Sequence, residues 1–186
     1  MYDFAVVGVG PAGARFARRA AEAGYDVVAF EQGTVGTPLA CSGHVSTDIW
    51  GYVPDDAAAR LRQNRVYGAR FHIGGPDTAA HPFYKSEAIS NVIDRVELDR
   101  TLAACAEDAG ADIREHHTVV DVDERHDGVT LTISHADGIE TVRAQMVAGC
   151  DGPTSRVRRQ SGLPEPEELL HGVLAKVKDR GGQHRA

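Results

Sequence analysis

The sequence predicts an α/β fold in which a parallel sheet is covered by helices. Two apolar runs, residues 3–9 and 26–30, have the pattern of buried parallel strands, and an alanine-rich helical pattern over residues 12–23 separates them. Later in the chain, short alternating runs are joined by turns that contain Asp-Gly, which is typical of antiparallel hairpins. These observations predict a Rossmann-like βαβ unit with a right-handed crossover, followed by a β-meander.

Three further segments are expected to be helical. Pro11 suits the first turn of the first helix, and Gly24 suits its end. A short helical stretch is expected near residues 56–63, inside an otherwise irregular region. Apolar residues at helical spacing predict a longer helix within residues 95–109, which Gly110 closes, and the stretch "DGPTSRVRRQSG" begins the last one.

The remaining strands follow from alternating or apolar runs. They are expected at residues 66–74, 81–90, about 117–124, 129–135, 139–145 and 146–150. The turn "GGPD" joins the first two of these, and the stretch "HGVLAKVK" predicts the start of one more strand before a polar tail.

Composition narrows the class of protein. The hydrophobic content of 42% and the charged content of 25% are those of a soluble globular protein. The net charge of −7 comes without a basic cluster, which argues against nucleic-acid binding. We see no signal peptide, and no apolar stretch approaches the roughly 18 residues of a membrane span, so a cytoplasmic location is the default. Three separated cysteines and nine scattered histidines predict neither a disulfide framework nor a metal site.

The glycine motif near the N-terminus is the strongest functional signal. Gly8, Gly10 and Gly13 form GxGxxG between a strand and a helix, where a pyrophosphate can approach the backbone and the helix N-terminus. Glu31 ends the second strand about 20 residues on and can accept hydrogen bonds from both ribose hydroxyls. Its charge would repel a 2′-phosphate, so FAD or NAD is favoured over NADP. The alternative is a glycine-rich turn with a solvated Glu31.

Three weaker motifs follow along the chain. Arg95 and Asp99 open the long helix, where Arg95 either reaches a pyrophosphate or forms a surface ion pair, and Asp99 either holds Arg95 or caps the helix. Asp151 and Gly152 follow a buried strand, where Asp151 either faces a ligand or caps the next helix. Cys41 lies in the loop "PLACSGHVS", and a lone cysteine is more often a packing residue than a reactive one.

The order of these motifs resembles the FAD-dependent oxidoreductase superfamily that includes aromatic hydroxylases. The resemblance rests on GxGPxG, Glu31, RxxLD, the meander and "CDGPTSRVR", and it covers roughly residues 1–162. It implies FAD as cofactor, with the glycines and Glu31 on its ADP half. The loop "TPLACSGHVS" and the helix "VIDRVELDRTLAACAEDAGADI" are similar to the geranylgeranyl reductase family, although that family usually has Cys-Gly where this chain has Cys41-Ser42-Gly43.

The family resemblance implies an enzyme that reduces C=C bonds of isoprenoid chains in lipids. Its partners would be an isoprenoid lipid and a reduced electron donor, either NAD(P)H or ferredoxin, with peripheral membrane contact. By resemblance, Cys41 lies by the flavin ring as the candidate catalytic residue, and the backbone near Val120 lies on the adenine side. The predicted cofactor-binding residues are Gly8, Gly10, Ala12, Gly13, Glu31, Gln32, Cys41, Ser42, Gly43, Arg95, Val120, Asp151 and Gly152.

The resemblance also indicates what this chain lacks. Family members are about twice as long and carry a further FAD motif, GDA, in their second half, which is absent here. We therefore expect an FAD-binding domain over residues 1–162, in which about 65–92 belong to a substrate-side sheet. Residues 163–186 would be a truncated start of the antiparallel substrate domain. Two alternatives stay open: an FAD-dependent aromatic-type monooxygenase, and a non-catalytic nucleotide-binding fragment.

Overall fold

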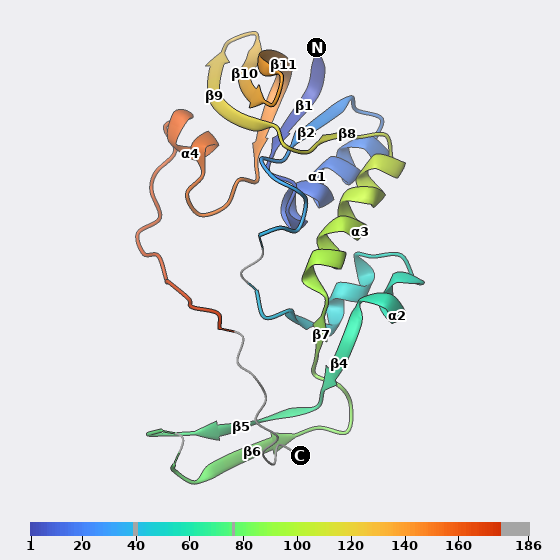
Figure 1. The fold of residues 1–186 in the computed structure, drawn as a ribbon, viewed down its shortest axis with the longest axis vertical. Coiled ribbons are helices and arrows are strands. Elements are labelled where there is room, and N and C mark those ends of the chain that lie inside the picture. Colours follow the sequence, from blue (N-terminus) through green and yellow to red (C-terminus); the bar gives the residue numbers. More distant parts are fainter. Residues whose placement is uncertain (39–40, 76, 176–186) are drawn as a thin grey trace.

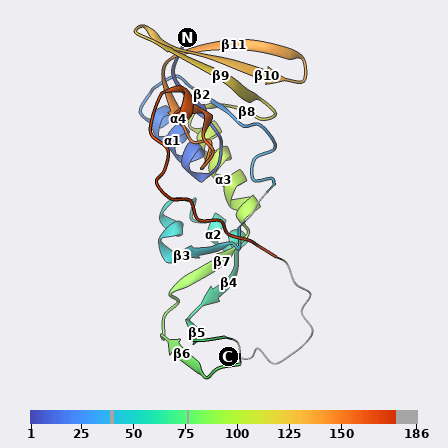
Figure 2. The same cartoon turned by 90° about the vertical axis from the view of Figure 1, so that its left-hand side faces the viewer.

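A six-stranded sheet lies at one end of the molecule and a β-hairpin at the other (Figures 1 and 2). The computed structural model describes residues 1–38, 41–75 and 77–175. The large sheet has the strand order β8-β2-β1-β11-β10-β9, in which the first four strands are parallel and the last two are antiparallel. The predicted α/β fold with a parallel sheet and a β-meander is therefore confirmed.

Two of the parallel strands form where the sequence is apolar and nearly free of charge. β1 (Tyr2–Val7) and β2 (Val27–Phe30) occupy the two predicted runs, and all four residues of β2 are buried. β8 (Asp112–Arg114) pairs with β2 at the edge of the sheet. β8 was not predicted, because its three residues include two charges and carry no apolar pattern.

The strand β11 (Gly138–Gly149) joins the meander to the parallel sheet. We expected two strands here, at residues 139–145 and 146–150, and that division is wrong. Ala144 pairs antiparallel with Val129 of β10 (Gly128–His135) and parallel with Tyr2 of β1. No turn residue interrupts residues 138–149, so one continuous strand pairs with β10 in its first part and with β1 in its last part.

Two apolar clusters cover the opposite faces of the sheet. On one face, α1 (Pro11–Glu22) and α3 (Arg95–Asp108) pack against each other, and α1 packs against β1 and β2 while α3 packs against β8. On the other face, β9 (Thr118–Arg125) and β10 fold over the parallel strands. Figure 2 shows the meander and the helices α1 and α3 on opposite sides of the parallel strands. No helix in the described part of the chain is long and apolar enough to cross a membrane.

The short helix α4 (Arg156–Gln160) follows β11 and packs on the meander side of the sheet. Val157 is its buried residue, and a side chain on Gly149 would lie only 2.8 Å from Val157 Cβ. The described residues after α4 form no strand, including 171–175 of the stretch "HGVLAKVK". The rest of that stretch, residues 176–178, lies outside the described residues.

The region between β2 and α3 carries two small sheets, and its residues Val53, Ala57 and Leu61 belong to the same apolar cluster as residues of α1 and α3. A three-stranded sheet has the order β3-β7-β4, and β5 and β6 form the hairpin at the far end of the molecule (Figure 1). The hairpin confirms the predicted pairing around "GGPD", although its strands are shorter than expected. The elements are β3 (His44–Ser46), a 3-10 helix (Thr47–Gly51), α2 (Ala57–Leu61), β4 (Arg62–Val66), β5 (Gly68–His72), β6 (Ala80–Tyr84) and β7 (Ser90–Ile93).

Two glycines allow β1, α1 and β11 to approach closely. Gly8 has φ of +90°, and a Cβ added there would lie 2.5 Å from the carbonyl oxygen of Cys150. A Cβ on Gly13 would lie 1.9 Å from the carbonyl oxygen of Gly8, which is well inside contact distance. Neither position can accept a side chain without moving the helix away from the strand.

We expect Gly13→Ala to lower the free energy of unfolding by about 1–3 kcal/mol, because the new methyl group overpacks the contact between α1 and β1. Gly10→Ala is the matched control, since no atom lies within 4 Å of a Cβ at that position. Its cost should stay below about 1 kcal/mol, the range for replacing a helix cap. Denaturant unfolding measures both values, and equal losses would contradict the close-approach explanation.

Candidate functional site: a cofactor cavity at the strand ends

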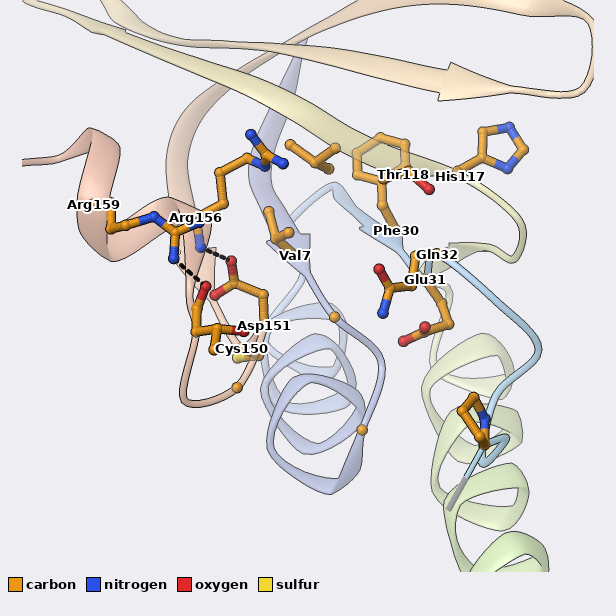
Figure 3. Close-up of a pocket in the computed structure, with 16 residues that line it drawn as sticks. Val7, Phe30, Glu31, Gln32, His117, Thr118, Cys150, Asp151, Arg156 and Arg159 are labelled. Atoms are coloured by element: carbon orange, nitrogen blue, oxygen red, sulfur yellow. Dashed lines mark hydrogen bonds between the residues drawn. The ribbon is translucent and has the colours of Figure 1, made fainter. Parts of the chain in front are cut away.

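A cavity of about 580 Å³ opens at the carboxyl ends of the parallel strands (Figure 3). Gly8 follows β1, Glu31 follows β2 and Cys150 follows β11, so three neighbouring strands deliver one residue each. This is the edge at which open α/β sheets bind ligands. The lining residues are Val7, Gly8, Gly10, Phe30, Glu31, Gln32, Pro38, His117, Thr118, Val119, Cys150, Asp151, Gly152, Thr154, Arg156 and Arg159.

The N-terminus of α1 gives one side of this cavity an affinity for anions. Gly10 is the cap residue of α1, and no side chain caps the first turn, which also contains no acidic residue. The backbone N–H groups of a first helical turn carry partial positive charge. Arg156 and Arg159 add two guanidinium groups to the lining. A pyrophosphate fits this arrangement, because it is anionic and Gly10 leaves room for it.

Glu31 is held rigidly at the end of β2. Its Oε2 accepts a hydrogen bond from the Val9 N–H at 3.0 Å, and its Oε1 accepts one from the Gly33 N–H at 3.2 Å. Each carboxylate oxygen keeps a further lone pair that can accept a hydroxyl proton. The fixed carboxylate therefore fits the two hydroxyls of an unphosphorylated ribose, and Gln32 lines the cavity beside it.

Asp151 holds the start of α4 and also lines the cavity. Its Oδ2 accepts hydrogen bonds from the backbone N–H groups of Arg156, at 2.6 Å, and Val157, at 3.2 Å, in the first turn of α4, whose N-cap residue is Ser155. Its buried Oδ1 has no hydrogen-bond partner among the described residues, and Asp151 lines the cavity. Burial alone would raise the pKa of Asp151, but hydrogen bonding by Ser155 and by the backbone of α4 lowers it. The carboxylate thus stays charged, with one oxygen free for a ligand donor.

Cys41, Arg95 and Asp99 form a second cluster at the start of α3. The Arg95 guanidinium donates hydrogen bonds to Cys41 Sγ at 3.2 Å and to Asp99 Oδ1 at 3.1 Å. Asp99 is 4% exposed, so burial raises its pKa while Arg95 opposes that shift. Asp99 is therefore buried and Arg95 partly buried, so they do not form a surface ion pair, and Asp99 holds Arg95 instead of capping the helix. Asp94 is the cap, because its Oδ1 accepts a bond from the Glu97 N–H.

The structure separates the predicted site residues into groups. Six of them line the cavity: Gly8, Gly10, Glu31, Gln32, Asp151 and Gly152. Gly13 acts indirectly, by setting how close α1 lies to Gly8, and Ala12 stands in the same helical turn without lining the cavity. Cys41 and Arg95 belong to the second cluster. Gly43 lies close to β7, where an added Cβ would be 2.3 Å from the Ile93 carbonyl oxygen.

Two predicted positions, Val120 and Ser42, do not line the cavity. The carbonyl oxygen of Val120 accepts a hydrogen bond from Arg156 at 2.9 Å. The lining residues of β9 are its neighbours Thr118 and Val119. Ser42 Oγ accepts a bond from the His44 N–H at 3.3 Å and so shapes the loop after Cys41.

Several lining residues were not predicted from the sequence. Phe30, His117, Thr118 and Arg159 reach the cavity only because their elements converge there. Phe30 has the pattern of a core strand residue, and Arg159 has that of an exposed helical charge. Position in the chain was the one usable signal for Phe30, because it ends a buried parallel strand and ligands bind at such strand ends.

The chain is similar to curated reductases that are about twice its length. It is 34% identical over 185 residues to the digeranylgeranylglycerophospholipid reductase of Thermoplasma acidophilum, which covers 96% of this chain and 46% of that protein. The enzyme of the same name from Methanothermobacter thermautotrophicus is 30% identical over 186 residues, covering 95% of this chain and 46% of that protein. The chain thus spans about half the length of these relatives.

Solved structures share the fold. The crystal structure of a geranylgeranyl bacteriochlorophyll reductase-like protein from Thermoplasma acidophilum matches 87% of this chain and 42% of its own, with a TM-score of 0.75 and 31% identity. A p-nitrophenol 4-monooxygenase from Pseudomonas putida matches 87% of this chain and 44% of its own, with a TM-score of 0.72 and 21% identity. The second similarity shows the fold alone.

The family of this chain follows from a match to a family model. The model described as an FAD binding domain matches residues 1–179 of this chain. Its match covers β1, the glycine turn, Glu31, the meander and Asp151, which are the elements that build the cavity. The uncapped helix N-terminus and the fixed Glu31 carboxylate fit the ADP portion of that cofactor. The chain therefore belongs to the FAD binding domain family, and FAD is its cofactor.

Proposed function

We propose that this chain is the FAD-binding part of a reductase that saturates C=C bonds in the isoprenoid chains of lipids. The observation that carries the proposal is the similarity to digeranylgeranylglycerophospholipid reductases, at 34% identity through 96% of this chain. The resemblance of the loop around Cys41 to the geranylgeranyl reductase family supports the same assignment. The aromatic-type monooxygenase is the second candidate, since the p-nitrophenol 4-monooxygenase shares the fold.

In this proposal the residues of the chain hold and orient the cofactor. FAD, when reduced, supplies a hydride for one carbon of the double bond, and a proton completes the other carbon. The first turn of α1, with Gly10, holds the pyrophosphate, and the Glu31 carboxylate accepts hydrogen bonds from the ribose hydroxyls. Asp151 offers its free Oδ1 to a ligand donor. These contacts fix the position of the cofactor and supply binding energy away from the reacting atoms.

The second cluster supplies the residues proposed to act near the substrate. Arg95 is fixed by its bonds to Asp99, and it in turn fixes the thiol of Cys41. In the proposed reaction Cys41 is the candidate proton source for the second carbon, with Arg95 as its positioning residue. The electron donor in this proposal is NAD(P)H or ferredoxin. A lipid substrate implies peripheral contact with a membrane, and a cytoplasmic location is part of the same proposal.

We expect Glu31→Ala to weaken FAD binding about 10- to 100-fold, the loss expected for hydrogen bonds to a charged group. Titration with FAD, followed by flavin fluorescence, measures the Kd. Glu165→Ala is the matched control, because Glu165 is a surface residue paired with Arg158 outside the cavity. Glu31→Gln keeps one acceptor oxygen for the backbone N–H groups. Comparing it with Glu31→Ala shows whether the weaker binding comes from lost ribose contacts or from a local change of folding. Equal Kd values for the Glu31→Ala and Glu165→Ala variants would rule out the ribose role.

The reaction itself is tested with FAD-loaded protein reduced by dithionite without oxygen. Added digeranylgeranylglycerophospholipid should reoxidise the flavin, and the lipid should gain two hydrogen atoms for each reduced bond, as measured by mass spectrometry. Lipid that already lacks double bonds is the control and should leave the flavin reduced. Oxygen-dependent hydroxylation of an aromatic substrate, with no lipid reduction, would instead favour the monooxygenase.

A further inference from the structure

His117, His135 and Glu140 converge at the edge of the meander, although they are far apart in the sequence. Each offers one ligand atom, and these atoms lie within 4.8 Å of one another. All three side chains are partly buried. The scattered histidines of the sequence predicted no metal site, because the ligands stand on three different segments and share no spacing motif.

The three residues extend the buried rows of three neighbouring strands. His135 stands two residues after Ile133 on β10, so the two share one face, and Glu140 of β11 is the cross-strand partner of Ile133. Val119 of β9 also pairs with Ile133, and His117 stands two residues before it. The inner face of the meander is apolar up to this point and then changes to two imidazoles and one carboxylate.

Local contacts leave a ring nitrogen of each histidine available. His117 Nδ1 lies 2.6 Å from the carbonyl oxygen of Glu115, which holds a proton on Nδ1 and leaves the lone pair on Nε2. His135 Nδ1 lies 4.0 Å from a carboxylate oxygen of Asp137, which is too long for a hydrogen bond. Metal-binding histidines typically donate their second ring nitrogen to a carbonyl or carboxylate, as His117 does, because the bond fixes the ring.

Glu140 can turn to a metal at small cost. It accepts a hydrogen bond from Arg114 at 3.3 Å, which is longer than the 2.7 Å bond that Arg114 makes to Asp112. Arg114 also donates to the hydroxyl of Tyr2 at 2.9 Å. The guanidinium therefore keeps two partners if Glu140 leaves it, and the Glu140 charge becomes available to a cation.

We infer that His117, His135 and Glu140 form a binding site for a divalent transition metal, with Zn²⁺ as the ion of choice. Two imidazole nitrogens and one carboxylate oxygen are a donor set that Zn²⁺ accepts, and a water molecule completes four-coordination. Ligand atoms around Zn²⁺ lie roughly 3.4 Å apart, and the three candidate atoms lie within 4.8 Å of one another, so side-chain rotation must bring them closer. The two rings are stacked, with centroids 4.9 Å apart and planes 15° from parallel, so at least one ring turns for both lone pairs to meet at one ion.

The site would link the strands of the meander at the rim of the cofactor cavity. His117 lines that cavity, and its ring centroid lies 6.4 Å from that of Phe30, which is also a lining residue. The bound ion would connect β10, β11 and the segment that enters β9. This inference does not depend on the reaction proposed above, because Zn²⁺ binding is measured without flavin or lipid.

Titration of metal-free protein with Zn²⁺ in a calorimeter tests the inference. We expect one equivalent to bind and the thermal unfolding temperature to rise with Zn²⁺ concentration. Co²⁺ should give the visible absorption of a site with nitrogen and oxygen ligands. No binding of Zn²⁺ at millimolar concentration would overturn the inference.

Variants then locate the ion. His117→Ala and His135→Ala should each weaken Zn²⁺ binding by at least about tenfold and remove the Co²⁺ absorption. Glu140→Gln preserves the size of the side chain and should weaken binding with little effect on the metal-free unfolding temperature. His126→Ala is the control, because that side chain is 96% exposed on the meander and outside the cluster. If a folded His117→Ala/His135→Ala double variant binds Zn²⁺ as tightly as the parent, the assignment is wrong.

Discussion

The structure depends on the close contact between the turn after β1 and its two neighbours. Gly8 lies against the carbonyl of Cys150 at the end of β11, and Gly13 lies against the carbonyl of Gly8. These contacts bring the N-terminus of α1 to the ends of three strands, and the cofactor cavity forms where they meet. Any side chain at these glycines would separate the helix from the sheet, and the N–H groups of its first turn would leave the cavity.

Groups of both charges line the cavity. The first turn of α1 and the arginines of α4 supply its positive charge. The carboxylates of Glu31 and Asp151 are both fixed by backbone N–H groups, so they keep their positions when no ligand is bound. Such prior fixing reduces the ordering that binding must impose, which increases affinity.

The long strand β11 belongs both to the meander and to the parallel part of the sheet. Its first residues pair with β10 in the meander, and its last residues pair with β1 beside the glycine turn. Glu140 therefore stands near one end of a strand whose other end leads into Asp151. The cofactor cavity and the cluster of His117, His135 and Glu140 are thus built on the same strand.

The local pattern of the sequence was enough to predict the α/β class, the glycine turn, Glu31 and the hairpins, because each depends on neighbouring residues or a fixed spacing. It was not enough to show that residues 139–150 form one strand, since only pairing with β1 and β10 decides where a strand continues. It also left the roles of Arg95, Asp99 and Asp151 open, because burial and hydrogen-bond partners decide them. The histidine cluster depends wholly on tertiary structure, since its ligands meet only when three strands align in register.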